Sequence, residues 1–375
     1  MNNTKFMDKL LDGVEVEWKA LGDECFFEIA NSGRKPVKAS LRVPGETPYY
    51  GANNIQDYVE GYTHDGEFVL IAEDGSASLE NYSIQYATGK FWANNHVHVI
   101  RGKIGVNTRF LYHYLCIVNY IPFLTGGGRA KLTKGSMVEI QIPIPCPENH
   151  KKSLEIQAEI VRILDTFTEL TVELTAELTA RKKQYNYYRD QSLSFEEGEV
   201  EWKTLGEICE NISSGRNKSK SDVGLYPVFG STGVIGRTNH KAYDEEQILV
   251  ARVGANAGRV NIAKGEYDVS DNTLIVKNRK NIVLKYLYYV LVNMNLNQFA
   301  KGAGQPLITG GQLKSIQVPV PSSKEQSRIV TLLDKFDALA NSITEGLPRE
   351  IALRQQQYEY YRDLLLSFPK PEKKI

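Results

Sequence analysis

Basic and amide side chains gather beside glycine turns in several short loops of the chain. In the first half these side chains are Arg34, Lys35, Lys38, Asn53, Asn54, Arg129, Lys131 and Lys134. In the second half they are Arg216, Lys218, Lys220, Ser231, Thr232, Arg252, Asn256, Arg259 and Gln305. Arg, Lys, Asn and Gln hydrogen-bond the base edges of the DNA major groove, and Arg and Lys also bind phosphates. The clusters therefore predict a surface that contacts nucleic acid.

Two of the clusters predict different kinds of contact. A Ser-Gly-Arg motif occurs in both halves, at 32–34 and 214–216. Because a shared motif cannot distinguish two different sequences, it favours phosphate contacts. One position holds Arg129 in the first half and Gln305 in the second, so it favours base recognition. A single loop residue of this kind is more often solvated, and the prediction depends on the clusters.

Other chemistries find little support. The segments 16–19 and 200–203 contain the Glu-x-Lys of metal-dependent nucleases, but no Pro-Asp precedes the first copy. His96 and His98 are spaced like metal ligands on one face of a strand, yet the second half has Asn and Leu there. The sequence has no GxxxxGK[ST] phosphate loop and no Asn-Pro-Pro-aromatic motif of base methyltransferases. We therefore expect no catalytic residue, no metal and no cofactor in this chain.

The chain contains an internal repeat. VEVEWKALG at 14–22 returns as GEVEWKTLG at 198–206, and RKKQYNYYRDQSLSF at 181–195 returns as RQQQYEYYRDLLLSF at 354–368. A shift of 302 − 126 = 176 aligns 126–145 with 302–321 without a gap. Upstream, a shift of 248 − 69 = 179 aligns 69–72 with 248–251. The segments that return in both halves, here called the joints, flank intervals that differ between the halves. This pattern predicts one scaffold that carries two different recognition domains.

Each globular interval ends in a proline-rich strand that precedes a long helical pattern. Apolar residues at steps of three or four form a narrow stripe on each helix, which is typical of helices that pack along one another. The stripe residues are Ile160, Ile163, Phe167, Leu170, Leu174, Ile329, Leu332, Phe336, Leu339 and Ile343. Ser153 and Ser323 are candidate helix caps. Gly346 and Pro348 are expected to interrupt the second helix.

Composition limits the class of protein. The 375 residues hold 45 basic and 45 acidic side chains, so the chain alone should bind DNA weakly and rely on partners for phosphate affinity. No apolar run approaches the roughly 20 residues of a membrane span, and the four cysteines have no CxxC spacing. The start of the sequence lacks a signal-peptide pattern. A cytoplasmic protein is expected.

At the repeated joints the chain resembles the specificity subunits of type I restriction-modification enzymes. The segment TELTVELTAELTA at 168–180 and the SITEGLPRE at 342–350 are similar to the type IC subfamily. The resemblance covers somewhat under half of the chain. It implies that each divergent interval recognises one half of a split, asymmetric DNA site and that the two helices set the spacer.

The resemblance also implies partners. Two methyltransferase subunits, which carry the S-adenosylmethionine chemistry, would dock on the helices, and restriction subunits would join with Mg²⁺ and ATP. Tyrosines and arginines near the helix ends favour packing against a domain or a methyltransferase subunit over base stacking. These residues are Tyr185, Tyr188, Arg189, Tyr358, Tyr361 and Arg362.

The predicted fold is mixed α/β (α+β), with two pseudo-repeated globular domains joined by two long antiparallel coiled-coil helices. The predicted boundaries are an N-terminal segment at 1–13, a recognition domain at 14–148, a helix at 149–195, a recognition domain at 196–321, a helix at 322–368 and a tail at 369–375. Residues 5–11 are expected to pack near the C-terminal helix. The alternatives are a coiled-coil adaptor that binds only proteins and, less favoured, a tandem nuclease.

Overall fold

The computed structural model describes residues 9–11, 13–126, 130–196, 198–218, 221–302, 304–342 and 344–369. Three predicted residues, Arg129, Lys220 and Ile343, lie outside these ranges. The chain divides into two compact units: unit 1 is Met1–Glu173 with Ala352–Ile375, and unit 2 is Leu174–Ile351. The C-terminal residues therefore fold with the first half of the chain. No helix in the described ranges is long and apolar enough to cross a membrane.

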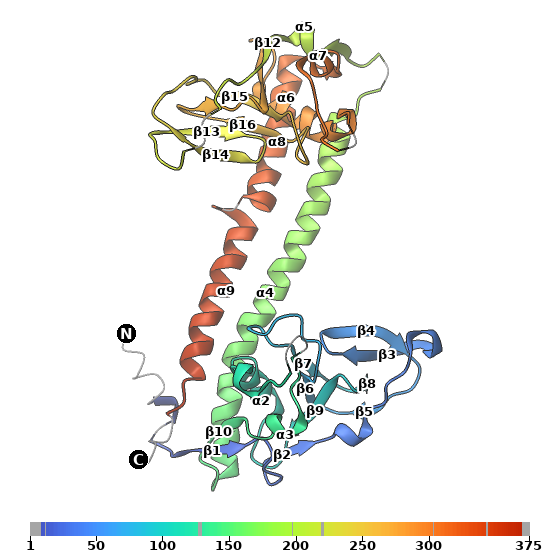
Figure 1. The fold of residues 1–375 in the computed structure, drawn as a ribbon, viewed down its shortest axis with the longest axis vertical. Helices are drawn as coiled ribbons and strands as arrows, with labels where there is room; N and C mark the ends of the chain where they lie inside the picture. Colours follow the sequence, from blue (N-terminus) through green and yellow to red (C-terminus); the bar gives the residue numbers. More distant parts are fainter. Residues whose placement is uncertain are drawn as a thin grey trace. The chain divides into compact units, whose positions relative to one another are not determined.

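Unit 1 contains three antiparallel or mixed sheets (Figure 1). A two-stranded sheet pairs β1 (Val16–Ala20) with β10 (Gln141–Pro145). The central sheet, in the order β2-β9-β6-β7, consists of β2 (Phe27–Ile29), β9 (Val97–Gly102), β6 (Phe68–Ala72) and β7 (Ile84–Ala87). The outer sheet, in the order β4-β3-β8-β5, consists of β4 (Asn54–Val59), β3 (Pro44–Gly51), β8 (Lys90–Ala93) and β5 (His64–Asp65).

Unit 2 repeats this arrangement. Its two-stranded sheet pairs β11 (Glu201–Thr204) with β19 (Gln317–Val320). The central sheet, in the order β12-β18-β15-β16, consists of β12 (Cys209–Ser214), β18 (Thr273–Asn278), β15 (Gln247–Ala251) and β16 (Val260–Ala263). The outer sheet, in the order β14-β13-β17, consists of β14 (Gly233–Thr238), β13 (Tyr226–Gly230) and β17 (Asp268–Val269). The prediction of two mixed α/β repeats is confirmed.

Strand register agrees with the repeat and refines it. Val69 lies opposite Ile100, and Ile248 lies opposite Val276, as the shifts of 179 and 176 require. Ile29 also lies opposite Ile100, whereas it is Ile212 that lies opposite Val276, a shift of 212 − 29 = 183. The Ser-Gly-Arg motifs, which align at 182, are therefore displaced by one residue. The physical reason is that β12 continues through Ser214, whereas 31–33 form the 3-10 turn η1 (Asn31–Gly33).

The outer-sheet hairpins are also equivalent. The order of the loop residues in the sequence aligns Asn53 and Asn54 with Ser231 and Thr232, and the structure corrects this by one residue. Gly51 pairs with Asn54, and Gly230 pairs with Gly233. The two-residue tips are thus 52–53 and 231–232, so that Asn53 corresponds to Thr232 and not to Ser231.

Short helices complete each unit. They are α2 (Thr108–Leu115), η3 (Ile121–Phe123) and α3 (Lys134–Met137) in unit 1, and α5 (Leu205–Ile208), α6 (Leu284–Asn293), η4 (Leu296–Phe299) and α7 (Gly310–Lys314) in unit 2. A further turn, η2 (Ala39–Leu41), precedes β3. Thr133 and Thr309 cap α3 and α7 by accepting the amides of Ser136 and Gln312.

The long helices are α4 (His150–Leu193), α8 (Ser323–Asn341) and α9 (Gly346–Leu365). The second helical pattern is interrupted between α8 and α9, and Gly346 there adopts φ +77°, with Ala338 O 2.4 Å from where a Cβ would lie. The residues that cap the long helices are not the predicted Ser153 and Ser323 but residues that precede them. Asn149 accepts the Lys152 amide at the start of α4, and Ser322 accepts the Glu325 amide at the start of α8.

In each unit two long helices pack antiparallel. In unit 1, Ile156 and Ile160 of α4 share a core with Leu365 and Phe368. Further along, Phe167 stacks on Tyr361 at 5.2 Å. In unit 2, Tyr188 stacks in the same way on Phe336 of α8 at 5.2 Å, while Leu193 shares a core with Ile329.

The predicted apolar stripe adjoins a second apolar face. Ile160 and Ile329 of the stripe are fully buried, as are the neighbouring Leu164 and Leu333, which the sequence did not single out, whereas Ile163 and Leu332 are half-buried. Phe167, Leu170, Leu174, Phe336 and Leu339 are also half-buried. Each helix thus has two adjoining apolar faces, one for its sheet domain and one for its partner helix.

The described residues nearest the two ends of the sequence pack together in unit 1. Leu11 lies in the same apolar cluster as Leu366 and Phe368, and Trp18 Nε1 donates to Pro369 O at 2.8 Å. Leu193 occupies the position in unit 2 that Leu366 occupies in unit 1. The predicted contact of the N-terminal segment with the C-terminal helix is thus seen for residues 9–11.

A buried glutamine on each long helix holds the short helix of its unit. Gln157 Oε1 accepts the Asn107 amide at 2.8 Å, and its Nε2 donates to Gly105 O at 2.8 Å. In unit 2, Gln326 Oε1 accepts the Val283 amide at 2.8 Å. Both glutamines are almost fully buried, so each satisfies backbone groups that water cannot reach.

An aspartate eight residues, or about two turns, further along each helix makes a second contact of this kind. Asp165 accepts hydrogen bonds from His113 Nε2 at 2.8 Å and from Arg109 Nε at 3.0 Å. Asp334 accepts from Lys285 Nζ and Tyr289 Oη, each at 2.6 Å. Figure 1 shows α2 against α4 in unit 1 and α6 against α8 in unit 2. Burial opposes ionisation of Asp165, but its hydrogen bonds outweigh burial and lower its pKa.

The histidines of unit 1 predict acid sensitivity. Burial lowers the pKa of His98 and His113 from the ordinary value of 6.5. As pH falls, these histidines are protonated in the unfolded chain at a higher pH than in the folded one. Unit 1 should therefore lose stability as pH falls through about 6.5, by about 1 kcal/mol per histidine for each pH unit. Amide hydrogen exchange at pH 7.5 and 5.5 should show lost protection in unit 1 alone, because unit 2 has Leu274 and Tyr289 at these positions. His113→Tyr should reduce the loss; equal losses in both units would contradict this prediction.

Candidate nucleic-acid interface

Glu73, the residue after β6, is the centre of the polar cluster in unit 1. Its carboxylate pairs with Arg34 Nη1 at 2.6 Å and with Lys131 Nζ at 3.0 Å. Arg34 also donates to Val97 O at 2.8 Å. Burial alone would raise the pKa of Glu73, but the hydrogen bonds from Arg34 and Lys131 outweigh it and lower that pKa. Arg34 is therefore committed to the fold, and its geometry favours a structural role over the expected phosphate contact.

The predicted loops of unit 1 meet around this cluster. Asn53 Nδ2 donates to Gly75 O at 2.7 Å, and its Oδ1 accepts the Ala77 amide at 2.8 Å. The Leu132 amide donates to Glu73 O at 2.7 Å. The Ser-Gly-Arg turn, the hairpin tip and the loop before α3 are thus joined to the loop after β6, although they are far apart in sequence.

The two histidines of this region have partners in the fold. His98 Nδ1 accepts from Asn31 Nδ2 at 2.9 Å, and Nε2 donates to Leu132 O at 2.8 Å. His96 Nδ1 contacts Asp74 at 2.5 Å. Across the described ranges, no group of three or more His, Cys, Asp or Glu side chains is placed to hold a metal.

Several predicted residues of unit 1 remain exposed. Lys38, Asn54 and Lys134 are exposed, and the two lysines form no ion pair with a described residue. Lys35 is also exposed and lies over the Trp92 ring at 5.8 Å. These side chains are available to a ligand, in contrast to Arg34.

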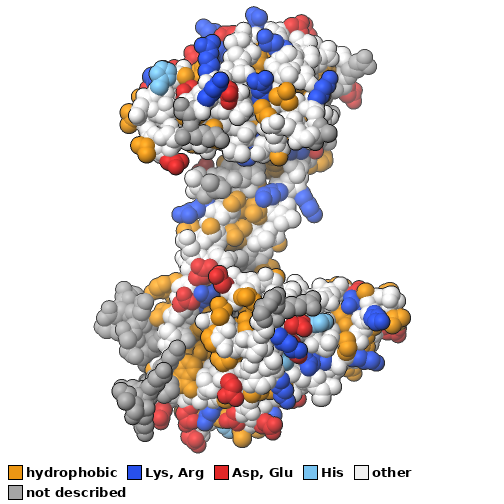
Figure 2. Space-filling model, viewed as in Figure 1, with side chains coloured by type: hydrophobic (Ala, Val, Ile, Leu, Met, Phe, Trp, Pro, Cys, Tyr) orange, Lys and Arg blue, Asp and Glu red, His pale blue; other side chains and the backbone are white. Residues whose placement is uncertain are grey.

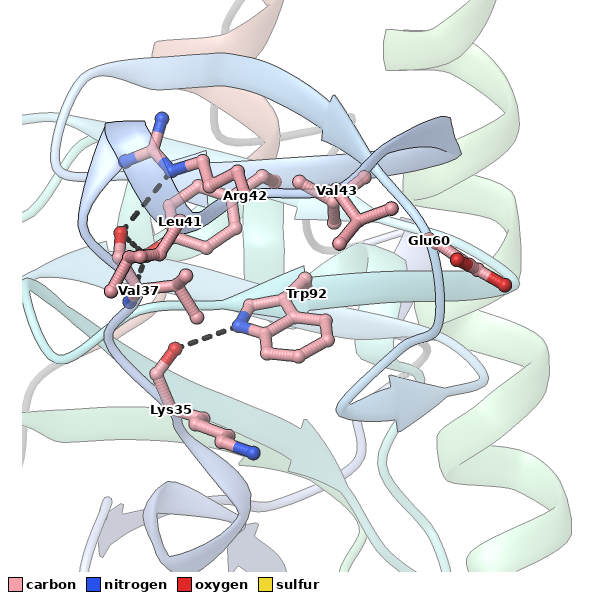
Figure 3. Close-up of a pocket in the computed structure, with 9 residues that line it drawn as sticks. Lys35, Val37, Leu41, Arg42, Val43, Glu60 and Trp92 are labelled. Carbon is pink, nitrogen blue, oxygen red and sulfur yellow. Dashed lines mark hydrogen bonds between the residues drawn. The ribbon is translucent and has the colours of Figure 1, made fainter.

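Lys35 and Trp92 line an apolar hollow of about 290 Å³ in the outer sheet (Figure 3). Trp92 Nε1 donates to Lys35 O at 2.7 Å, and the Arg42 guanidinium lies over the Tyr49 ring at 4.1 Å. Leu41 and Val43 on its rim are 69% and 58% exposed. Sequence reasoning missed this hollow, because its residues come from four separate segments.

In unit 2 the corresponding loops meet at Arg252, the residue after β15. Arg252 Nη1 donates to Ser214 Oγ at 3.3 Å. The Ile308 amide donates to Arg252 O, and the Gly254 amide donates to Pro306 O, each at 2.9 Å. The structure thus brings together three segments that hold predicted residues, 214–218, 252–259 and 301–307. Arg216, Lys218 and Gln305 are exposed there, and Thr232 is exposed at the hairpin tip, where Ser231 is half-buried.

Unit 2 also has a hollow, of about 650 Å³, which is lined by Asn256 and Arg259. It also contains Asn261, Asn295 and Asn297, which the sequence did not single out. Asn297 Nδ2 donates to Ala257 O at 3.0 Å and holds the glycine-containing turn. Amide side chains around an exposed arginine are the chemistry that recognises base edges.

Neither unit shows a broad basic surface on the face that Figure 2 presents. Basic and acidic side chains are interspersed on the face of both units seen in Figure 2. Residues 14–147 carry 12 basic and 14 acidic side chains, whereas 199–321 carry 15 basic and 11 acidic. Local loops, and not a broad basic surface, must therefore provide any DNA contact.

The expected subunit-contact residues are partly used by their own unit. Tyr185 is buried, and burial raises its pKa to about 12. Arg189 lies over Tyr185 and Arg362 over Tyr358, at 5.7 and 5.9 Å. Tyr188 and Tyr361, which stack on phenylalanines, remain 36% and 37% exposed. These last two retain surface for a partner.

The paired arginines give a prediction about stability. Arg34→Ala should destabilise the protein by about 1 to 3 kcal/mol, because it leaves the half-buried Glu73 without its main partner. Arg216→Ala should change stability by no more than about 0.5 kcal/mol, because Arg216 is exposed and forms no described ion pair. Urea unfolding measures both; equal costs would contradict the assignment of Arg34 to the fold.

Comparison with known proteins identifies similar chains. The family described as "Type I restriction modification DNA specificity domain" matches residues 14–182 and 197–353. A putative type I restriction enzyme specificity subunit of Haemophilus influenzae is 48% identical, over 98% of this chain and 99% of that protein. A type I restriction enzyme specificity subunit of Escherichia coli is 37% identical over 99% of each chain.

Solved structures agree at the level of the fold. The S subunit of a type I restriction-modification system from M. genitalium superposes with a TM-score of 0.67 and 16% identity, over 96% of this chain and 98% of that one. A chain from a study of complex assembly and conformational transition of the type I R-M system gives a TM-score of 0.55 and 16% identity, over 94% of this chain and 98% of that one.

Proposed function

Because the chain belongs to the type I restriction-modification DNA specificity family, we propose that each of its two units recognises one half of a bipartite DNA site. Its role is to supply DNA sequence specificity to a type I enzyme and not to catalyse a reaction itself. The observation that carries the proposal is the equivalence of the two central sheets, whose loops gather at Glu73 in one unit and at Arg252 in the other. Different side chains on one framework imply two unlike half-sites.

We propose that the long helices set the unread spacer. α4 is a continuous helix of 44 residues that contributes to both units, and a helix of that length extends about 66 Å. Half-sites contacted from one face of the duplex lie about one helical turn, or 34 Å, apart. The length of the helix between the units would then select the spacer.

The proposed partners are two methyltransferase subunits and, in the full complex, restriction subunits. Tyr188 and Tyr361, with Arg189 and Arg362 beside them, are proposed as contacts for the methyltransferase subunits. S-adenosylmethionine, Mg²⁺ and ATP would be bound by those partners. Since the chain carries no net charge, much of the phosphate affinity would also come from them. A cytoplasmic location, where duplex DNA is accessible, forms part of this proposal.

Reconstitution tests the proposal. The purified chain is mixed with a type I methyltransferase subunit, and adenine methylation is measured on DNA with a randomised sequence. Methylation that requires the chain and falls on one bipartite motif supports the proposal. A stable complex that methylates without sequence preference would instead favour the protein adaptor, and metal-dependent cleavage by the chain alone would favour a nuclease.

A further inference from the structure

The two units carry opposite charges at one equivalent position. The Glu73 amide donates to His96 O at 2.8 Å and its carbonyl accepts the Leu132 amide at 2.7 Å. The Arg252 amide donates to Asn272 O at 2.9 Å and its carbonyl accepts the Ile308 amide at 2.9 Å. Glu73 and Arg252 are 179 positions apart in the sequence. Their partners, His96 with Asn272 and Leu132 with Ile308, are each 176 positions apart, and the same two shifts relate the paired strands of the two units. The backbone framework is therefore the same, and only the side chain has changed sign.

The surroundings have changed with it. In unit 1 the carboxylate of Glu73 is held by Arg34 and Lys131. The position equivalent to Lys131 in unit 2 is Leu307, which shares the same isolated bridge pattern. Arg252 forms no ion pair with a carboxylate in the part of the chain that the structure describes. Unit 1 neutralises this position internally, whereas unit 2 leaves it positive.

The Arg252 guanidinium makes few hydrogen bonds to the described part of the chain. Its Nε is enclosed without a partner, and only Nη1 reaches a described residue, Ser214, at 3.3 Å. Thr273 Oγ1, on the strand beside β15, is likewise enclosed without a partner. Enclosed polar atoms without partners cost free energy. The fold thus leaves the half-buried Arg252 guanidinium with hydrogen-bonding capacity that the described residues do not use.

We infer that Arg252 is a specificity-determining residue of unit 2 and recognises a guanine in the second half-site, while Glu73 closes the equivalent position of unit 1. This inference depends on the proposed function. An arginine fork pairs with guanine O6 and N7 in the major groove. A phosphate contact would be needed in both units and would keep a cation in both, whereas this position changes from acid to base. A difference of that kind is what two unlike half-sites require.

The test uses the intact chain with its methyltransferase partner and a DNA library randomised in the second half-site. Arg252→Ala should reduce discrimination at one guanine by about tenfold to a hundredfold, with the first half-site and the spacer unchanged. Arg252→Lys keeps the charge but loses the fork, and should relax the same position. Arg279→Ala is the matched control, since Arg279 is an exposed arginine beyond the other end of β18.

The outcomes separate the two proposals. If the unmodified complex yields no bipartite motif, the proposed function fails. If it yields one that lacks a guanine in the second half-site, or whose bases are unaffected by both Arg252 variants, the inference alone is overturned. A uniform loss of affinity at all sequences, with a shallower salt dependence, would show a phosphate contact and would also overturn it. Thermal unfolding shows whether each variant is folded. If Arg252→Ala does not fold, Arg252→Lys still tests the inference.

Discussion

Insertion of one Thr-Ala-Glu-Leu unit after Leu178 is expected to lengthen the preferred spacer by one or two base pairs and to leave both half-sites unchanged. Four residues add about 6 Å, a little more than one turn of helix, which is slightly less than two base-pair steps of about 3.4 Å. The insertion preserves the stripe, because Leu170, Leu174 and Leu178 already follow one another at steps of four and are all half-buried. Methylation of a library in which only the spacer varies would measure the change.

A matched control keeps the helix length constant. Glu177→Gln alters an exposed residue of the existing Thr-Ala-Glu-Leu segment at 175–178 and should leave the preferred spacer unchanged. An unchanged optimum in the insertion variant, in a complex that still methylates DNA, would show that helix length does not set the spacer. A changed half-site would show that the helix does more than separate the units.

Gln157→Leu is expected to destabilise unit 1 by about 2 to 4 kcal/mol. Gln157 is fully buried, and its side chain hydrogen-bonds Asn107, Gly105 and Ser153. Leucine has a similar volume but leaves the Asn107 amide and the Gly105 carbonyl without partners in the interior. Gln326→Leu should have the same effect in unit 2, where the Val283 amide loses its acceptor. Urea unfolding followed by hydrogen exchange would assign each loss to its unit.

The control is Gln355→Leu, an exposed position on α9, where the change should cost no more than about 0.5 kcal/mol. Because the two buried glutamines lie in different units and share no partner, the double variant should show the sum of the single costs. Equal, small effects for Gln157 and Gln355 would contradict the view that the buried glutamines fix the short helices to the long ones.

The sequence predicted the framework well because the repeat constrains register. The shifts of 176 and 179 state which residues of the two halves correspond, and the observed pairs Val69–Ile100 and Ile248–Val276 agree with both shifts. Gly346 and Pro348 likewise predicted the break between α8 and α9, since backbone restrictions are local. The fold class and the family follow from these joints.

The polar contacts could not be predicted in the same way. Gln157 and Asp165 face inward on a helix most of whose other polar residues are exposed, and a periodic pattern does not distinguish them. Their signal was the repeat itself, which pairs Asp165 with Asp334 and Arg109 with Lys285. The sequence predicted Arg34 as a contact for nucleic acid because its partner in the fold, Glu73, lies 39 residues away. Only the folded chain brings the two side chains together.

The most direct test of the central claim exchanges one recognition interval for the other. Residues 23–138 are replaced by a second copy of 207–314, so that Lys285 and Tyr289 of the copy meet Asp165 as the originals meet Asp334. The methylome of cells that express this chain with its partner subunits is then sequenced beside that of the unmodified chain. Two units that each recognise one half-site predict an asymmetric bipartite motif for the unmodified chain and an inverted repeat of its second half for the exchanged one. A motif that keeps the first half-site after the exchange would contradict the account.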